Sequence, residues 1–455
     1  MTERFNRIAD FALCLQATDI PESALHAAAL MTLDTLGVAA AATPMEAGVI
    51  ARDTADLLYA SNDPDHSARM LFDGRSVSLA GAAYAAATQI DNLDAHDGFN
   101  PVKGHIGVAV VPTLAVLAQH LPELSGPEAL AAITVGYEIA GRAGLALHAS
   151  VSDYHTSGAW NALGVAAVAA RLRGQTAEQL RQALGIAEYH GPRSQMMREI
   201  ANPTMLHDGS GWGAMVGISA AILAENGFDG APALTIEAED AAPHWEDLGR
   251  VWQMEQQYIK PYPICRWAHA AIDAVTSIMR THDLAYDQIT RVRINSFHEA
   301  ASLFPDMPGT TSQAQYSMHF AVATQMVHGR IGVAQISGAG LNDPLVAALL
   351  SKIEVHEADN HNARFPACRT ADAEIETLDG RVLRSGDTHA RGGTEVPMSE
   401  EEIIEKYMDF AAPCLGEARA AEIRDGVLGL LQGESRFSDL LPLLCEPLQR
   451  PGDRV

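Results

Sequence analysis

Ionisable side chains gather in one short segment that separates two apolar stretches of the chain. Asp91, Asp94 and His96 follow an alanine-rich stretch, and Lys103 and His105 come just before the next apolar run. Such groups are costly to bury unless they are paired or take part in chemistry. The segment therefore fits an active site, but it also fits a polar loop that faces solvent. A metal site is a third alternative, because Asp and His are good ligands, although a lysine among the acids argues against it.

A second candidate group precedes a predicted helix over residues 160–172. His155 stands beside Thr156 and Ser157, which are natural N-cap residues. The positive end of a helix dipole favours the neutral form of a nearby imidazole, and a neutral imidazole can accept a proton. His155 is therefore either a general base or a side chain that only completes a capping network.

Basic groups cluster further along the chain, around two prolines that fix a loop. These groups are Lys260, Arg266 and His269. If a helix begins near Arg266, then Arg266 and His269 lie on one face, three residues apart. Arginine binds carboxylates through two parallel hydrogen bonds. The cluster predicts a carboxylate-binding site, with a surface loop of ordinary basic residues as the alternative.

A glycine-rich segment over residues 205–217 could hold an anion at a helix N-terminus. Asp208 or Ser210 is predicted to cap a helix that starts near Gly211. The glycine spacing does not indicate a nucleotide site, because no strand precedes it and no acidic residue follows at the required distance. It favours close helix packing instead. The sequence contains no recognisable nucleophile elbow, phosphate-binding loop or zinc-protease motif.

The elements that would position these groups are helices up to about residue 260. Alanine-rich segments with apolar residues at helical spacing predict buried helices. The predicted helices cover residues 78–90, 127–147, 160–172, 177–185 and 211–226. Thr176 is a predicted N-cap, and Asn226-Gly227 is a predicted helix stop.

Between about residues 285 and 390 the pattern changes to mixed α and β. The predicted strands and helices cover residues 289–296, 352–357 and 371–385 (a hairpin around Asp379-Gly380), and residues 269–282 and 317–326. Ser399, followed by three glutamates, predicts a helix N-terminus. The remainder is helical again to about residue 444.

Composition narrows the class of protein. The chain has 455 residues, of which 47% are hydrophobic and 19% are charged, so two domains with packed cores are expected. A net charge of −26 argues against nucleic acid and anionic membranes as partners. The five cysteines are widely spaced, so no disulfide framework or structural zinc is expected. The N-terminus is unlike a signal peptide, and the longest apolar run, residues 107–118, is short and broken by Pro112, so a cytoplasmic protein is expected.

Three of these motifs, in this order, resemble the MmgE/PrpD family, which includes 2-methylcitrate dehydratase, cis-aconitate decarboxylase and iminodisuccinate epimerase. The resemblance covers nearly the whole chain. The family's aspartate-rich segment before His-x-Gly is similar to residues 91–112. Its aromatic-His pair before a small-residue helix is similar to residues 154–171, and its Lys-Pro-Tyr-Pro-x-Cys-Arg-x-x-His motif is matched by residues 260–269.

The resemblance implies a mainly α fold. A large all-helical domain would be formed by both chain ends, residues 1–265 and 396–455, with a smaller α+β lid domain inserted over residues 266–395. The family also implies a homodimer, a small carboxylate substrate and chemistry without cofactor or metal. Carried over motif by motif, the acid–base residues would be Asp91, His105, His155 and Lys260. Residues that would bind substrate are Asp94, His96, Lys103, His207, Arg266, His269 and Tyr316.

The chain also departs from the family pattern. Ala95 takes the place of a threonine in the aspartate-rich segment, and His207 stands near the position where many members have a lysine. The tyrosine of the lid helix aligns best with Phe320, with Tyr316 and His319 close by. These differences concern the substrate more than the fold.

Motifs and resemblance together predict a lyase that acts on a small di- or tricarboxylate, with a hydro-lyase as the first hypothesis. Lys260 and Arg266 would bind carboxylates and stabilise a carbanion formed next to one of them. His155 or His105 would take the proton. The same proton abstraction without loss of a group gives an epimerase or isomerase. A decarboxylase would also fit these motifs, and so would a non-catalytic binder of organic acids.

Overall fold

The computed structural model describes residues 2–433 and 435–448, and the chain forms two compact units. Unit 1 contains the described residues up to Met196, then His207–Gln257, and those from Ser399 onward. Unit 2 contains Met197–Leu206 and Tyr258–Met398. The chain passes between units after residues 257 and 398, whereas the boundaries expected from the sequence follow residues 265 and 395.

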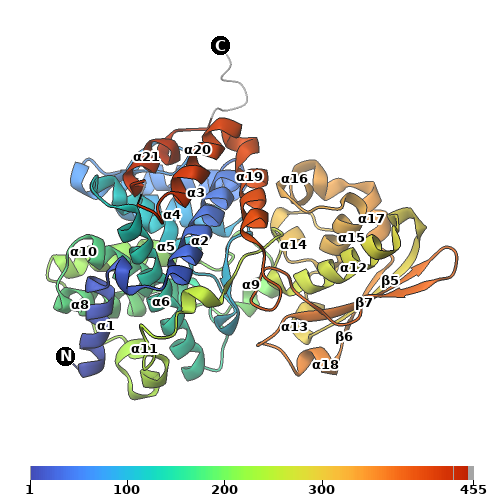
Figure 1. The fold of residues 1–455 in the computed structure, drawn as a ribbon, viewed down its shortest axis with the longest axis horizontal. Helices are drawn as coiled ribbons and strands as arrows, with labels where there is room; N and C mark the ends of the chain where they lie inside the picture. The colour runs from blue at the N-terminus through green and yellow to red at the C-terminus, as the bar shows by residue number, and fades with distance from the viewer. Residues whose placement is uncertain (1, 434, 449–455) are drawn as a thin grey trace, which may run out of the picture. The chain divides into compact units, whose positions relative to one another are not determined.

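Unit 1 is built almost entirely from helices, so the prediction of a mainly α chain is confirmed. Its helices are α1 (Glu3–Cys14), α2 (Glu22–Ala42), α3 (Glu46–Leu58), α4 (Leu79–Asp91), α5 (Gly107–Leu117), α6 (Gly126–Ser150), α7 (Gly158–Leu172), α8 (Ala177–His190), α10 (Ser210–Glu225), α11 (Leu234–Glu237), α19 (Glu400–Leu415), α20 (Glu417–Leu428) and α21 (Phe437–Cys445). Its strands are short: β1 (Ser67–Arg69) pairs antiparallel with β2 (Ser76–Ser78), and β3 is Gly98–Phe99. N-terminal and C-terminal helices pack together in this unit, because α19 contacts α2, drawn in red and blue in Figure 1.

Glycines allow α10 to pack closely against its neighbour α7. A Cβ atom at Gly217 of α10 would lie 2.6 Å from the carbonyl oxygen of Ala162 on α7. A Cβ atom at Gly213 would lie 2.7 Å from the carbonyl oxygen of Gly158. Carbon and oxygen cannot approach so closely without displacement of the backbone, since protein interiors are close-packed. The predicted packing role of these glycines is confirmed.

Two predicted helix starts are confirmed by their capping contacts. Thr176 and Gln179 form a capping box at the start of α8, and Ser399 and Glu402 form one at the start of α19. In each box the hydroxyl accepts from the backbone of the third helical residue, whose side chain accepts in return from the cap. These signals were readable because all of the partners lie within three residues.

Two other predicted caps are wrong. Helix α10 begins at Ser210, so its N-cap residue is Gly209, which has no side chain to cap the helix, and the Asp208 side chain binds Ser157 instead. Helix α7 starts after Ser157, whose hydroxyl makes no cap hydrogen bond. In both cases the polar side chain is taken by a partner that is remote in sequence, as described below.

Apolar helices of unit 1 are buried along nearly their full length. Every residue of α5 is buried, and the helix continues through Pro112, so this proline does not interrupt it. By length and composition alone, α2 and α6 could cross a membrane, but 83% and 94% of their most apolar windows are buried inside the structure. Burial in a protein core accounts for their composition without a membrane.

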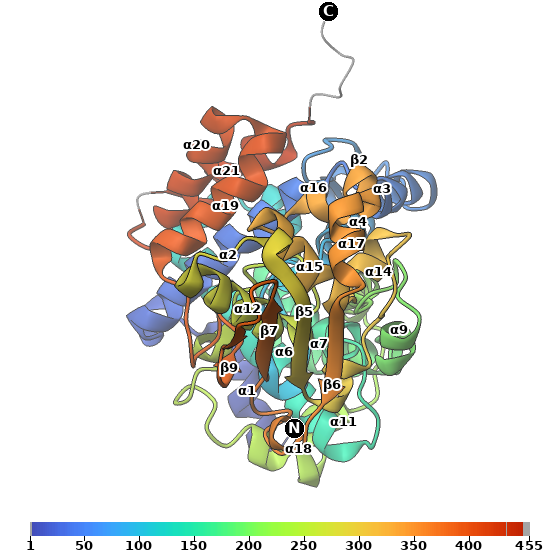
Figure 2. The same ribbon diagram turned by 90° about the vertical axis from the view of Figure 1, so that its right-hand side faces the viewer.

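Unit 2 combines a small sheet with helices. Strands β5 (Ile289–Ser296), β6 (Ile353–Glu357), β7 (Thr370–Thr377), β8 (Val382–Arg384) and β9 (Thr388–His389) form the sheet. β5 pairs parallel with β6 and antiparallel with β7, while β8 and β9 both pair with β7 (Figure 2). The predicted hairpin is confirmed, with Gly380 in the left-handed region at its turn (φ 82°). β4 (Gln257–Tyr258) lies at the point where the chain passes from unit 1 to unit 2.

The helices of unit 2 are mostly short. They are α9 (Met197–Ala201), α12 (His269–His282), α13 (His298–Ala301), α14 (Thr311–Gln315), α15 (Met318–His328), α16 (Val333–Ile336), α17 (Pro344–Leu350) and α18 (Asp359–Asn362). The two long ones, α12 and α15, contact each other and pack on β7 and β6 respectively. Both were predicted, and together with the sheet they confirm mixed α and β structure for this part of the chain.

Candidate active site

The candidate site of unit 1 begins where helix α4 ends. Asp91 is the last residue of α4, and its Oδ2 accepts a hydrogen bond from the backbone N–H of Ser210 at 3.0 Å. Ser210 is the first residue of α10. Asp91 therefore supplies, from another helix, the acceptor that a side-chain cap would have provided.

Asp208 connects the start of α10 to the start of α7. Its Oδ1 accepts from the hydroxyl of Ser157 at 2.8 Å and from the Ser157 backbone N–H at 3.2 Å. Its backbone carbonyl accepts from the N–H of Gly158 at 3.0 Å. The side chain is buried. These contacts hold the second oxygen of Asp208 in one direction.

That second oxygen lies near His105. The Nε2 atom of His105 is 3.6 Å from Oδ2 of Asp208, within ion-pair distance but longer than a hydrogen bond. The backbone N–H of His105 donates to the Ser157 hydroxyl at 3.0 Å. Its Nδ1 lies 2.5 Å from the carbonyl oxygen of Asp97. A carbonyl only accepts, so Nδ1 carries a proton and Nε2 is the atom left for acid–base exchange with Asp208.

His96 completes this group. Its ring lies edge-to-face with the ring of His105, with centroids 4.5 Å apart, and its Nε2 is 3.9 Å from Oδ1 of Asp91. Asp94 is buried beside it and has a left-handed backbone (φ 53°). We call Asp91, His96, His105 and Asp208 the carboxyl–imidazole cluster. Two carboxyls and two imidazoles this close together can exchange protons with one another.

The raised pKa values of two buried carboxyls in this segment also fit a role in proton transfer. Burial, and next the charge of Asp208, raise the pKa of Asp91 well above its usual range. Burial raises the pKa of Asp97 to about 7, against the hydrogen bond that it accepts from Gly107. Asp91 is therefore expected to keep its proton to a higher pH than an isolated carboxyl, first because burial disfavours the charged form and next because the Asp208 carboxylate repels a second negative charge. A protonated carboxyl of this kind can act as a general acid.

His155 lies in a second group of unit 1, beside a histidine that no sequence motif indicates. Its backbone N–H donates to Nε2 of His148 at 3.2 Å, and the two rings are stacked with centroids 6.4 Å apart. Burial lowers the pKa of His155, and burial together with nearby Lys103 lowers that of His148 to about 4. The neutral imidazole expected at position 155 is thus favoured, with burial as the largest cause.

Lys103 closes this second group. Its Nζ lies 4.9 Å from the centre of the Tyr154 ring, and the Tyr154 hydroxyl donates to the Lys103 carbonyl. Lys103 itself has a left-handed backbone (φ 55°). A cation over an aromatic face is held by the ring's charge distribution. The predicted polar segment, residues 91–105, therefore contributes to two groups of side chains: the carboxyl–imidazole cluster and the group around His148 and His155.

In unit 2, Arg266 is engaged by the protein's own backbone. Its guanidinium donates to the carbonyl oxygens of Arg391 at 2.5 Å and Ala390 at 3.0 Å, and stacks 4.3 Å from the centre of the Tyr258 ring. Burial lowers the pKa of Arg266 to about 10. These contacts give Arg266 a structural role that its motif does not reveal. Its role as a carboxylate clamp stays a prediction.

The other predicted residues of unit 2 are buried as well. His269 begins α12; its Nδ1 lies 3.5 Å from Arg266 and its Nε2 lies 2.9 Å from the carbonyl of Ile264. Lys260 and Tyr316 are 1% and 2% exposed. Burial of a lysine ammonium costs free energy unless it is paired or hydrogen-bonded, so Lys260 is not an ordinary surface residue.

Tyr316, His319 and Phe320 are the three candidates for the position of the family's lid tyrosine. Phe320 is fully buried within α15, where only packing is open to it. His319 is half-buried, its Nδ1 has no hydrogen-bond partner, and burial lowers its pKa. His319 and Tyr316 carry polar atoms that could meet a substrate. The choice between them stays open.

Within unit 1 the structure brings Asp91, His96 and His105 together, and it places His155 with Lys103 in the neighbouring group. Local sequence patterns do not reveal the roles of Asp208, Ser157 and His148. Asp208 was predicted to be a cap, and His148 lies in the last turn of α6, with no motif around it. His207 precedes Asp208, is buried and has a left-handed backbone (φ 46°).

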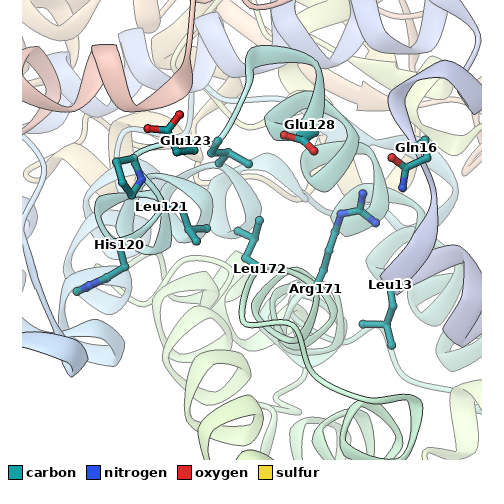
Figure 3. A pocket seen from close by; sticks show the side chains of 10 residues that line it. Leu13, Gln16, His120, Leu121, Glu123, Glu128, Arg171 and Leu172 are labelled. Carbon is teal, nitrogen blue, oxygen red and sulfur yellow. The ribbon is translucent and has the colours of Figure 1, made fainter.

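A cavity of about 450 Å³ lies elsewhere in unit 1. Figure 3 shows its lining side chains, among them Leu13, His120, Glu128 and Arg171. The Arg171 guanidinium donates to the carbonyl oxygens of Ala12 and Leu15. The cavity contains none of the predicted site residues and is not the candidate site.

The chain is a two-unit protein with a mainly helical unit, which holds a buried carboxyl–imidazole cluster, and an α+β unit. The chain belongs to the MmgE/PrpD family: residues 6–244 match the family's N-terminal domain and residues 262–430 match its C-terminal domain. The family assignment made from the motifs is thereby confirmed.

Curated relatives are similar along most of their length. A cis-aconitate decarboxylase of Aspergillus terreus is 23% identical over 96% of this chain and 94% of its own. The human cis-aconitate decarboxylase is 28% identical over 85% of this chain and 83% of its own. The mouse protein of that name is 26% identical over 79% and 76%.

Proposed function

We propose that this protein is a lyase that acts on a small di- or tricarboxylate through proton transfer at a carbon next to a carboxylate. The observation that carries the proposal is the cluster in which His105 Nε2 lies 3.6 Å from Asp208 and burial raises the pKa of Asp91. The family and the names of the relatives support it. They favour a lyase on a polycarboxylate and give the epimerase alternative no support.

The cluster would act as follows. A lyase that removes water needs a base for the carbon-bound proton and an acid for the leaving hydroxyl. A lyase that removes CO₂ needs only an acid, which protonates the carbanion left after the carbon–carbon bond breaks. His105, with Nδ1 fixed on the Asp97 carbonyl, would exchange protons through Nε2, and Asp91 would be the acid. Both reactions can use the same groups.

Elimination of water remains the first hypothesis, and decarboxylation is a second candidate that the names of the relatives favour. Lys260 and Arg266 stay predicted carboxylate-binding residues on the strength of their motif. The homodimer, the cytoplasmic location and the independence of metal and cofactor in the reaction stay predictions.

The test is a panel of cis-aconitate, citrate, 2-methylcitrate and smaller dicarboxylates, followed by proton NMR in deuterium oxide. Loss of CO₂ with one solvent deuterium in the product identifies a carboxy-lyase. Appearance or loss of a vinyl proton at constant carbon number identifies a hydro-lyase. Deuterium in recovered substrate without loss of any group would contradict the proposal and identify an epimerase. Tight binding without turnover or exchange would also contradict it.

A further inference from the structure

One group of metal-ligand side chains lies in unit 2, outside the candidate active site. Among the residues that the structure describes, the Cys368 thiol, the His389 imidazole and the Glu395 carboxylate place one ligand atom each within 4.8 Å of the other two. They come from three places: the loop before β7, the strand β9 and the turn that follows it. We propose that these three residues bind a divalent cation of the zinc class.

The donor set selects the kind of ion. Thiolate, imidazole and carboxylate together are the ligands of Zn²⁺ and of its spectroscopic substitute Co²⁺, whereas Mg²⁺ and Ca²⁺ take oxygen ligands. With ordinary zinc bond lengths, tetrahedral ligand atoms lie about 3.3–3.7 Å apart. Ligand atoms within 4.8 Å of one another therefore need to approach by at most about 1.5 Å to bind an ion. Three protein ligands leave the fourth position to water.

The charges around the group permit this binding. Arg364 is a cation near Cys368, and it is already paired with Asp387 through two hydrogen bonds, at 2.5 and 3.0 Å. Arg266 lies near Glu395 but donates to the carbonyls of Ala390 and Arg391. A thiolate and the Glu395 carboxylate would together balance the two charges of the ion.

The position of the ion indicates what it would do. Two of its ligands, His389 and Glu395, flank the carbonyls of Ala390 and Arg391 that hold the Arg266 guanidinium. An ion bound to both ends of this segment would fix those carbonyls. The proposed role is thus structural, because metal binding adds its free energy to that of the folded segment. It does not depend on the reaction that the protein catalyses.

The test is a titration of the metal-free full chain with Co²⁺, followed by absorption spectroscopy. We expect one Co²⁺ per chain, with a thiolate-to-cobalt charge-transfer band in the near ultraviolet. Cys368→Ser should abolish the band and weaken Zn²⁺ binding by at least about tenfold, measured by competition with a chromophoric chelator. Cys414→Ser is the matched control, since Cys414 is also half-buried but lies on α19.

Absence of the band in the parent protein would overturn the proposal, as would a band that survives in Cys368→Ser. If Cys368→Ser fails to fold, His389→Gln takes its place, and unchanged Zn²⁺ affinity in that variant would equally overturn it. No substrate is present in these measurements. The result of the metal titration is therefore independent of the activity measured with the carboxylate panel.

Discussion

Lys406 of α19 and Asp34 of α2 form a buried ion pair, with Nζ 2.5 Å from Oδ1. The same ammonium donates to the carbonyl oxygen of Ala95 at 2.7 Å. Ala95 lies between Asp94 and His96 in the segment that carries the candidate site. A lysine from the last helices of the chain thus holds the backbone of this segment in place, over more than 300 residues of sequence.

Lys406→Met should lower the free energy of unfolding by about 3–5 kcal/mol, because it leaves Asp34 buried without its cation. Burial already raises the pKa of Asp34 against the effect of Lys406. The double variant Lys406→Met/Asp34→Leu should regain most of the loss, since no charge remains to be desolvated. Denaturant unfolding measures the free energy of unfolding of the single and the double variant. A loss below about 1 kcal/mol in the single variant would contradict the importance of the pair.

Asp97 should make the protein less stable as pH rises toward neutrality. Its folded pKa is about 7 and its reference value is 3.8, so between these values the native state holds a proton that the unfolded state has lost. This contribution is complete near pH 4 and is lost as pH rises through 7. By linkage, the parent should lose about 2–3 kcal/mol more than Asp97→Asn between pH 5 and pH 8. Parallel stability curves for the two proteins would disprove the assignment.

Asp208→Asn should lower kcat by at least about a hundredfold, the lower end for loss of a proton-transfer partner. The amide oxygen can still accept from Ser157, but the charge that faces His105 disappears. The acidic limb of the pH–rate profile should move to lower pH, because the carboxylate favours a protonated imidazole. The exposed Asp229→Asn is the control for the same chemical change. A profile identical to the parent's would leave Asp208 a purely structural residue.

His155→Gln should also lower kcat by at least about a hundredfold while the fold is retained. His155 is half-buried with a lowered pKa, as a neutral base requires. His190→Gln serves as the control, because His190 is exposed at the end of α8. Near-normal turnover of His155→Gln on the substrate found in the panel would return His155 to a packing role beside His148.

Arg266→Lys should act on stability and on substrate binding in separable ways. Lysine keeps the charge but cannot donate to both the Ala390 and Arg391 carbonyls or stack as a plane on Tyr258, so stability should fall by about 1–3 kcal/mol. These backbone and ring contacts are the reason to expect a loss of stability. If Arg266 also binds a carboxylate, KM rises about tenfold or more at temperatures where the variant is folded. An unchanged KM would confine Arg266 to its structural role.

The sequence by itself determined the elements and the family. Helix starts at Thr176 and Ser399 and the hairpin at Gly380 were predictable because every interacting partner lies within a few residues. The order of three motifs was enough to assign the family, which the matching family domains confirm.

Only the tertiary structure decided which side chains act together. Asp91 and Asp208 are 117 positions apart in the sequence, and Lys406 meets Ala95 across more than 300. No local pattern can show that Asp91 accepts from Ser210 while Asp208 turns to Ser157. Hydrogen bonds and desolvation depend on distances of a few ångströms, and packing of remote helices sets those distances. For the same reason the burial that lowers the pKa of His155 is a property of the tertiary structure.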